Sequence, residues 1–304
     1  MNTQSQRRTG VAPVSNLKMS RSSGREFVFH AGRTDMNESN PERRQARRLS
    51  YKVWIIIALA AACSIAVFSY GPIPQSPEYS QFADHRGWLG IPNFLDVASN
   101  VFFLWIGVAG LMFLTNRSRS ANAFATQWER VPYFIFFIGV LGTTFGSSWF
   151  HLRPDNASLV WDRLPMTLAF MGFFTAMIGE RISLTAARRL LWPLVIFGIG
   201  SVGYWYWTEL TGKGDLRPYV LVQFFPMLAV PLMLAMFRSR YAGGGWLVAC
   251  LLLYGLAKGL EMADQPILDW LGISGHTLKH IASAAATWAV LQMLRTRSPI
   301  RAFP

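Results

Sequence analysis

Long apolar segments separated by short polar ones make up the chain from about residue 52 to near its C-terminal end. Each approaches the ~20 residues that an α-helix needs to cross the hydrocarbon core of a membrane. Hydrophobic residues make up 52% of the 304 residues and aromatic residues 14%, which is more apolar than an ordinary soluble domain. The pattern therefore predicts an all-α fold, a polytopic membrane helical bundle. The eight predicted spans are residues 52–70, 92–114, 131–150, 159–179, 190–208, 218–237, 246–262 and 276–294.

The chain carries a formal net charge of +13, and the distribution of this charge decides its meaning. Arginines concentrate in the N-terminal segment, in alternate connections between the spans and at the C-terminal end. This alternation is the positive-inside pattern of membrane proteins, so the charge does not indicate nucleic-acid binding. It predicts cytoplasmic termini and places residues 71–91, 151–158, 209–217 and 263–275 outside. The arginines are Arg7, Arg8, Arg43, Arg44, Arg47, Arg48, Arg117, Arg119, Arg181, Arg188, Arg189, Arg238, Arg240, Arg295, Arg297 and Arg301.

The first fifty residues differ from the rest in composition. They are rich in Ser, Arg and Asn and contain few large apolar residues, so residues 1–50 are predicted to be a disordered basic cytoplasmic tail. The first apolar run begins only near residue 53, so we expect residues 51–71 to be a retained transmembrane helix rather than a cleaved secretory signal. Because the first two dozen residues lack acids, a mitochondrial transit peptide is the alternative.

Three of the five histidines lie at the ends of apolar segments. His151 follows the third predicted span, and His276 and His280 begin the last one. Ser147 precedes His151 by four residues, and Asp162 follows it by eleven, at the start of the next span. A four-residue spacing places both members of a pair on one face of a helix. All five side chains therefore come to the same, outer side of the membrane in the predicted topology.

Three imidazoles beside a carboxylate and a hydroxyl are typical of a catalytic zinc site, where three protein ligands leave a fourth position for water. No cysteine is close enough in sequence to close the site as a structural one. The alternative is that each histidine is a hydrogen-bonded group at a helix end. Five such groups at one membrane boundary favour a functional site, because ionisable side chains are costly to bury in lipid.

Two further sets of polar residues recur at three- or four-residue spacing. The first lies on one face of the second span, where we expect either helix-to-helix hydrogen bonds or, beside the metal, support of its ligands or a cation site. The second lies near the end of the seventh span and either braces that helix or orients a metal-ligating histidine. The residues are Asn93, Asp96 and Asn100 in the first set, and Lys258, Glu261 and Asp264 in the second.

Two segments carry a resemblance to a known family. Residues 146–151 read Gly-Ser-Ser-Trp-Phe-His, and residues 161–166 read Trp-Asp-Arg-Leu-Pro-Met. With the late His-x-x-x-His helix, these segments resemble the alkaline ceramidases, within the wider group of seven-helix membrane hydrolases that also includes the progestin and adiponectin receptors. The family pattern is a serine four residues before a histidine, an aspartate eleven after it, and that late histidine pair. The resemblance covers roughly residues 82–294.

This resemblance implies a site and a reaction. His151, His276 and His280 would bind Zn²⁺, and Ser147 and Asp162 would act as catalytic groups on the activated water or the reacting carbonyl. The implied function is a zinc-dependent intramembrane lipid amide hydrolase. It would cleave ceramide, or another N-acyl sphingoid or amino lipid, to a fatty acid and an amine. The substrate is then a membrane lipid, for which lateral access from the bilayer is expected.

The resemblance also implies a domain layout. Residues 72–295 would form the seven-helix ceramidase-like catalytic domain, residues 51–71 an extra N-terminal transmembrane helix, and residues 296–304 a cytoplasmic tail. This layout is similar to that of bacterial members, which places the protein in a bacterial inner membrane with its site toward the periplasm.

One departure from the family concerns calcium. Animal alkaline ceramidases carry an acidic calcium-binding segment before the first core helix. The comparable region here holds Asp84, Trp88, Asn93 and Asp96, but it is shorter, and Asn93 stands where those enzymes have a glutamate. This departure puts Ca²⁺ dependence in doubt, and with it ceramide itself as the substrate.

Two other classes of function remain open on the sequence alone. A receptor-like signalling protein of the same seven-helix group would hold zinc with little turnover and would respond to a ligand. A proton-linked transporter would use the acids and histidines as a relay across the membrane.

Overall fold

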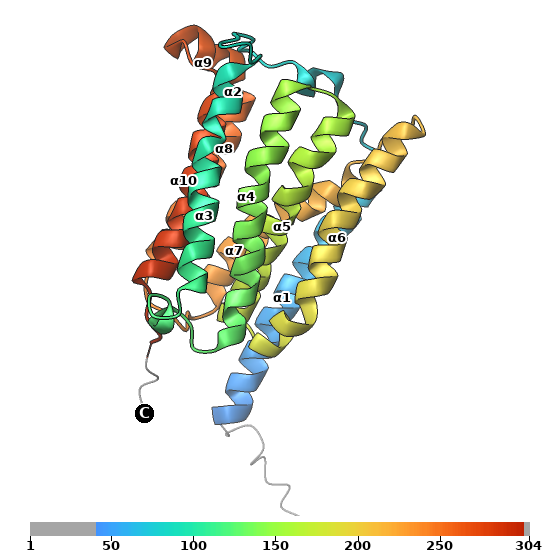
Figure 1. The fold of residues 1–304 in the computed structure, drawn as a ribbon. Coiled ribbons are helices and arrows are strands. Elements are labelled where there is room, and N and C mark those ends of the chain that lie inside the picture. Colours follow the sequence, from blue (N-terminus) through green and yellow to red (C-terminus); the bar gives the residue numbers. More distant parts are fainter. Residues whose placement is uncertain (1–40, 301–304) are drawn as a thin grey trace, which may run out of the picture. The chain divides into compact units, whose positions relative to one another are not determined.

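The computed structural model describes residues 41–300, and over this range the chain forms helices and no strands (Figure 1). The long helices are α1 (Pro41–Ser69), α3 (Val101–Thr115), α4 (Arg130–Leu152), α5 (Asn156–Arg181), α6 (Leu184–Leu210), α7 (Arg217–Met236), α8 (Gly245–Met262) and α10 (Gly275–Thr296). The short ones are α2 (Phe94–Ser99), α9 (Asp264–Leu271) and the single turns η1 (Pro77–Ser80), η2 (Ala121–Ala123) and η3 (Gln127–Glu129). The all-α prediction is confirmed over the described residues.

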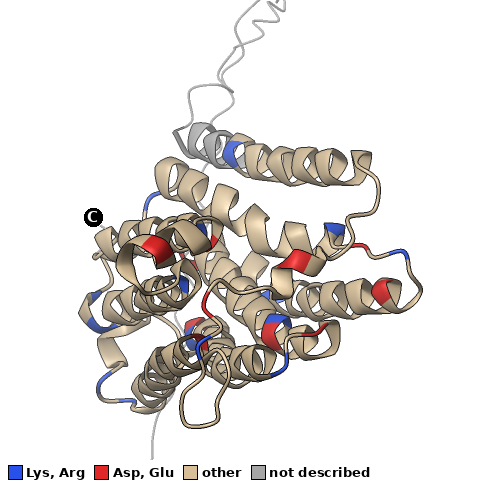
Figure 2. Cartoon of the chain, turned by 90° about the horizontal axis from the view of Figure 1, so that it is seen from above, with Lys and Arg blue, Asp and Glu red and all other residues tan. Residues whose placement is uncertain are grey.

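Each predicted span coincides with a helix, and the second corresponds to α2 and α3, which are separated at Asn100. Helices α5 and α10 are as long as the others but less apolar, because several charged residues and histidines lie on them. Elsewhere charged residues are sparse along the helices (Figure 2). The segments long and apolar enough to cross a membrane are Tyr51–Ser69, Phe94–Thr115, Gln127–Leu152, Leu184–Leu210, Arg217–Met236 and Gly245–Met262. Six such helices are the mark of an integral multi-pass membrane protein.

Helix α1 begins at Pro41 and so includes the last ten residues of the predicted 1–50 tail. Proline is favourable at the start of a helix, because the first N–H groups have no partner within the helix. The boundary of the helical region is therefore earlier than the apolar pattern predicts. The rest of the predicted tail, residues 1–40, lies outside the described residues, as do residues 301–304.

The predicted C-terminal tail begins with an ordered segment. The N–H of Ile300 donates to the carbonyl of Arg240 at 2.8 Å. Arg297 is buried, pairs with Glu180 and donates from Nε to the carbonyl of Ala123 at 2.7 Å. The charge pattern places Arg297 among the cytoplasmic arginines, and the structure shows that its side chain is buried and ties α10 to α5 and to the turn before α4.

The connections between helices gather at two opposite ends of the bundle, and hydrogen bonds join several members of each group. One end holds the connections that the sequence analysis assigned to the arginine-rich side, and the other end holds the candidate site. The first group is residues 116–129, 181–183, 237–244 and 297–300. The second is residues 71–93, 152–156, 210–217 and 263–275.

Glycines let α4 pack directly on α5. A Cβ added at Gly139 would lie 2.5 Å from the carbonyl oxygen of Pro165, and one at Gly146 would lie 1.9 Å from that of Trp161. Both distances are far below van der Waals contact, so only glycine allows this backbone approach. Small residues are typical where transmembrane helices pack closely. The approach at Gly146 brings the end of α4, with its serine and histidine, against the turn of α5 that carries Asp162.

Candidate metal centre

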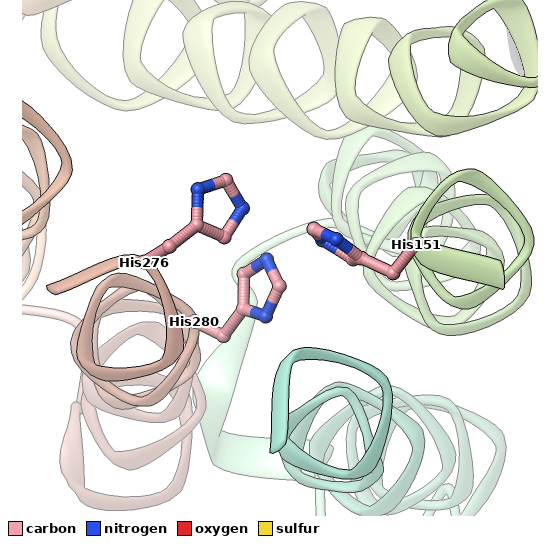
Figure 3. A group of neighbouring side chains, drawn as sticks. All are labelled: His151, His276 and His280. Carbon is pink, nitrogen blue, oxygen red and sulfur yellow. The ribbon is translucent and has the colours of Figure 1, made fainter. Parts of the chain in front are cut away.

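His151, His276 and His280 form one buried cluster at the site end of the bundle. One ring nitrogen from each lies within 4.8 Å of the corresponding nitrogens of the other two. The ring centroids are 4.9 to 5.0 Å apart, and the rings from α4 and α10 turn toward a common point (Figure 3). The sequence analysis predicted this group of three, and the structure confirms that they meet.

The start of α10 determines where two of the three rings lie. The Ser274 hydroxyl caps the helix by accepting from the N–H of Thr277 at 2.9 Å. A Cβ at Gly275 would lie 2.2 Å from the carbonyl oxygen of Leu260, so the first turn of α10 packs directly on the end of α8. The histidines that follow, at positions i and i+4, project from one face of α10 toward α4.

The hydrogen-bond partners of the imidazole nitrogens differ among the histidines. His280 Nδ1 lies 2.8 Å from the Ser99 hydroxyl and 3.2 Å from the carbonyl oxygen of Asp96. A proton on Nδ1 satisfies that carbonyl and leaves Nε2 as the metal-ligating atom. His151 Nδ1 is buried without any hydrogen-bond partner among the described residues. A buried polar atom without a partner costs free energy, and a metal ion would remove that cost.

The polar residues of α2 support the site rather than form it. Asn93 Nδ2 donates to the carbonyl of His151 at 2.8 Å, which ties the start of α2 to the end of α4. Asp96 Oδ1 accepts from the hydroxyls of Thr277 at 2.5 Å and Ser274 at 3.3 Å, at the start of α10. These contacts are helix-to-helix hydrogen bonds, one of the alternatives for this stripe, and they join α2 to the two helices that carry the histidines.

The charged residues at the end of α8, Lys258, Glu261 and Asp264, lie close to His276. Asp264 accepts from the N–H of His276 at 2.7 Å. Glu261 pairs with Lys258 at 2.7 Å and with Lys279 at 3.0 Å. The Lys279 ammonium lies 3.1 Å from His276 Nε2. Lys279 was not singled out in the sequence analysis, although its position directly before His280 in the last motif was a signal.

Phe82 is a second residue that the sequence analysis missed. Its ring lies 4.4 Å from the ring of His151 and 5.1 Å from that of His276, and only 3% of the residue is exposed. Of the polar groups in the same loop, His85 is exposed. An aromatic side chain therefore covers the histidines from the loop side and separates them from water.

The residues comparable to the ceramidase calcium segment have protein partners here. Asp84 forms an ion pair with Arg86 at 2.7 Å. The hydrogen bonds from Arg86 hold the pKa of Asp84 below its ordinary value of 3.8. Asn93 and Asp96 are engaged with α4 and α10, as described above. Within residues 41–300, the three histidines form the one group of three or more His, Cys, Asp or Glu residues close enough to hold a metal.

Ser147 and Asp162 are buried beside the histidines, on the wall of a cavity of about 470 Å³ that His280 also lines. The deeper wall of the cavity is largely apolar and comes from α4, α5, α7, α8 and α10. Its apolar lining includes Phe136, Val140, Met166, Ala169, Phe170, Phe173, Pro226, Met227, Leu251 and Ala286. The predicted catalytic pair thus stands at the junction between a histidine cluster and an apolar chamber inside the bundle.

No model of a known protein family matches this chain, and no curated protein matches it. The fold and the site by themselves define a helical, multi-pass membrane protein with a buried three-histidine cluster that is able to bind a metal ion.

Proposed function

We propose that this protein is a zinc-dependent intramembrane lipid amide hydrolase, similar to the alkaline ceramidases. In this proposal α2 to α10 form the seven-helix core and α1 is an additional N-terminal membrane helix. The single observation that carries the proposal is the cavity in which the Asp162 carboxylate, the Ser147 hydroxyl and His280, one member of the histidine cluster, meet an apolar chamber.

The metal site fits zinc by the chemistry of its donors. Three neutral imidazoles with no thiolate are the ligand set of catalytic zinc sites, which keep one position open. When bound, zinc supplies Lewis-acid chemistry, polarising a carbonyl and making water a nucleophile near neutral pH. The contacts from Ser99 and Asp96 would hold the His280 imidazole in place for the ion, and Asp264 would hold the backbone of His276.

Asp162 and Ser147 would carry the proton transfers and the charge. Asp162 accepts the proton of the attacking water and then delivers one to the leaving amine. The Ser147 hydroxyl donates to the carbonyl oxygen as negative charge develops on it. Both side chains are buried, and Phe82 closes the loop side, so these interactions act in a site with little competing water.

The cavity fits the acyl chain of a lipid. On α5 its lining runs from Asp162 to Phe173, eleven residues apart, which is about 16 Å at about 1.5 Å per residue. A ring on α7, that of Phe224, lines the cavity and is 41% exposed on the outer surface of the bundle. We therefore place lateral access from the bilayer beside α7 and α8, with the acyl chain lying along α5.

The proposed orientation follows the charge pattern. The connections rich in arginine share one end of the bundle, which we assign to the cytoplasm, and the site then opens near the outer boundary. In a bacterium this would be the periplasmic side of the inner membrane.

The test is hydrolysis of lipid amides by the purified, zinc-loaded protein in detergent, with released fatty acid measured by mass spectrometry. Ceramide, an N-acylethanolamine and an N-acylglycine of one chain length form the substrate panel. We expect release from at least one of them, and a loss of about 10²-fold or more in Asp162→Asn, since a positioned acid or base contributes typically 10²–10⁴-fold.

The control variant is His85→Ala, which removes an exposed histidine from the loop above the site and should retain full activity. Activity that survives in Asp162→Asn would contradict the assigned role of this carboxylate. Proton-coupled flux in sealed vesicles, with no hydrolysis of any lipid in the panel, would favour the transporter instead.

A further inference from the structure

Arg163 lies directly after Asp162 and lines the same cavity, yet the proposed reaction does not use it. The residue is 5% exposed, and its Nη2 donates to the side-chain oxygen of Gln75 at 2.6 Å. Its Nε and Nη1 are buried and have no hydrogen-bond partner among the described residues. None of the ion pairs formed by residues 41–300 includes this arginine.

Aromatic rings hold the Arg163 guanidinium in place but do not accept hydrogen bonds from its free N–H groups. The guanidinium carbon lies 4.3 Å from the ring centre of Trp205, 4.8 Å from that of Tyr219 and 5.4 Å from that of Tyr79. Cation–π contacts are made over the ring face, whereas the N–H donors of arginine lie in the plane of the guanidinium and need acceptors at its edge. The rings therefore fix the orientation of the cation and leave two donors for a ligand.

The cavity is otherwise poor in free anions. Glu261 is engaged by two lysines, Lys258 and Lys279. Asp162 is the remaining carboxylate on the wall, and it is not ion-paired among the described residues. With three cationic and two acidic side chains lining it, the cavity carries an excess positive charge. Buried charges are normally paired, so the unpaired guanidinium of Arg163 requires an anion from outside the chain.

The position of the arginine indicates which part of a ligand carries that anion. Gln75 and Tyr79 belong to the loop that covers the site end of the bundle, so Arg163 lies under this loop, while the apolar lining continues along α5 toward Phe173. A lipid whose acyl chain follows α5 and whose amide reaches Asp162 would place its headgroup at Arg163.

We propose that Arg163 binds an anionic headgroup, and that the substrates are N-acyl lipids with a carboxylate or phosphate beside the amide nitrogen. This inference rests on the proposed amidase function for the identity of the ligand. A carboxylate or phosphate accepts charge-assisted hydrogen bonds from a guanidinium, and Nε and Nη1 of Arg163 are both free to donate one. A neutral headgroup leaves the buried cation unpaired.

Binding without hydrolysis tests the inference separately from the amidase reaction. The probes are alkylsulfonyl analogues, in which a sulfonamide replaces the amide and resists hydrolysis. One analogue carries glycine, one ethanolamine and one phosphoethanolamine, all on the same alkyl chain. The dissociation constant of each is measured on the full-length protein in neutral detergent. We expect both anionic probes to bind at least about tenfold more tightly than the neutral one, since charge-assisted hydrogen bonds are the strong ones.

Three variants locate the effect. Arg163→Met should abolish the preference, and Arg163→Lys, which keeps the charge but not the planar guanidinium, should retain only part of it. Arg153→Met is the matched control, because it removes an exposed arginine at the same end of the bundle, and it should leave the preference intact. If Arg163→Met does not fold, the test rests on the ratio of the dissociation constants of the neutral and anionic probes in the wild-type protein and in Arg163→Lys.

Equal binding of neutral and anionic probes to the wild-type protein would overturn the inference, as would a preference that survives in Arg163→Met. The inference would also be overturned by a free fatty acid that binds as tightly as the glycine probe and loses as much affinity in Arg163→Met. Arg163 would then bind the carboxylate of the product rather than a headgroup. If no lipid amide is hydrolysed but the Arg163-dependent preference persists, the anion site stands and the amidase function fails.

Discussion

The contact between Gly146 and α5 makes the metal site sensitive to a single methyl group. In Gly146→Ala the new Cβ would lie 1.9 Å from the carbonyl oxygen of Trp161, whereas ordinary contact begins at 3.4 Å. The two backbones must therefore separate by about 1.5 Å, the difference between these distances. Neither atom belongs to a flexible side chain, so the helices themselves have to move.

The cost follows from this displacement. Overpacking in a closely packed core costs typically about 1–3 kcal/mol, and glycine to alanine in a helix recovers about 0.5–1 kcal/mol. We expect a net loss of about 1–2 kcal/mol and an apparent Tm in detergent lower by roughly 3–8 °C. Bound zinc should fall as well, because His151 lies on the displaced helix and metal–ligand distances tolerate only about ±0.2 Å.

The matched control is Gly200→Ala on α6, where an added Cβ meets nothing within 4 Å. This variant should keep its zinc and be at least as stable as the wild type, because alanine favours the helix. A Gly146→Ala protein with the Tm and zinc content of the control would refute the argument that this glycine sets the approach of α4 to α5.

Three further predictions concern the groups around the site and at the opposite end. Ser99→Ala removes the hydroxyl beside the His280 ring, and zinc affinity in chelator competition should fall about 10–100-fold; an unchanged affinity would dismiss its supporting role. Glu180→Gln leaves a buried arginine without its partner and should lower the free energy of unfolding by about 3–5 kcal/mol, seen as a lower apparent Tm; an unshifted Tm would show that the pair is not buried. Asp84→Asn should speed hydrogen exchange in the loop. Because Arg86 lowers the pKa of Asp84, the ion pair stabilises the loop fully above pH 3.8, and this stabilisation is lost as the pH falls through the lowered pKa. Slower exchange in the wild-type loop than in Asp84→Asn at still lower pH would contradict this account.

The helices were predictable because a membrane span requires a minimum apolar length, and each such run became a helix. The three histidines were predictable for the complementary reason, since titratable side chains stand out in apolar segments. Their proximity was predictable from the four-residue spacing on one helix face and from the alternating direction of successive membrane spans. The start of α1 at Pro41 was not predictable from hydropathy, because the helix continues beyond the apolar run into a polar sequence.

Long-range contacts account for what the sequence did not predict. Phe82 lies in a loop without periodicity, so nothing in its neighbourhood indicates that its ring covers the histidines. Ser99 and Lys279 adjoin recognised motifs, but their partners are far away in sequence or become visible only in three dimensions. Arg297 follows the pattern of a cytoplasmic charge, and only the position of Glu180 shows that it is buried.

The most direct test of the central claim is the metal content of the purified protein after loosely bound metal has been removed. The account predicts about one zinc per chain in the wild-type protein and in His85→Ala, and none in His276→Ala, although that variant should still purify as a folded protein. A wild-type protein that holds no zinc, even after metal is added back, would contradict the account, as would zinc retained in full by His276→Ala.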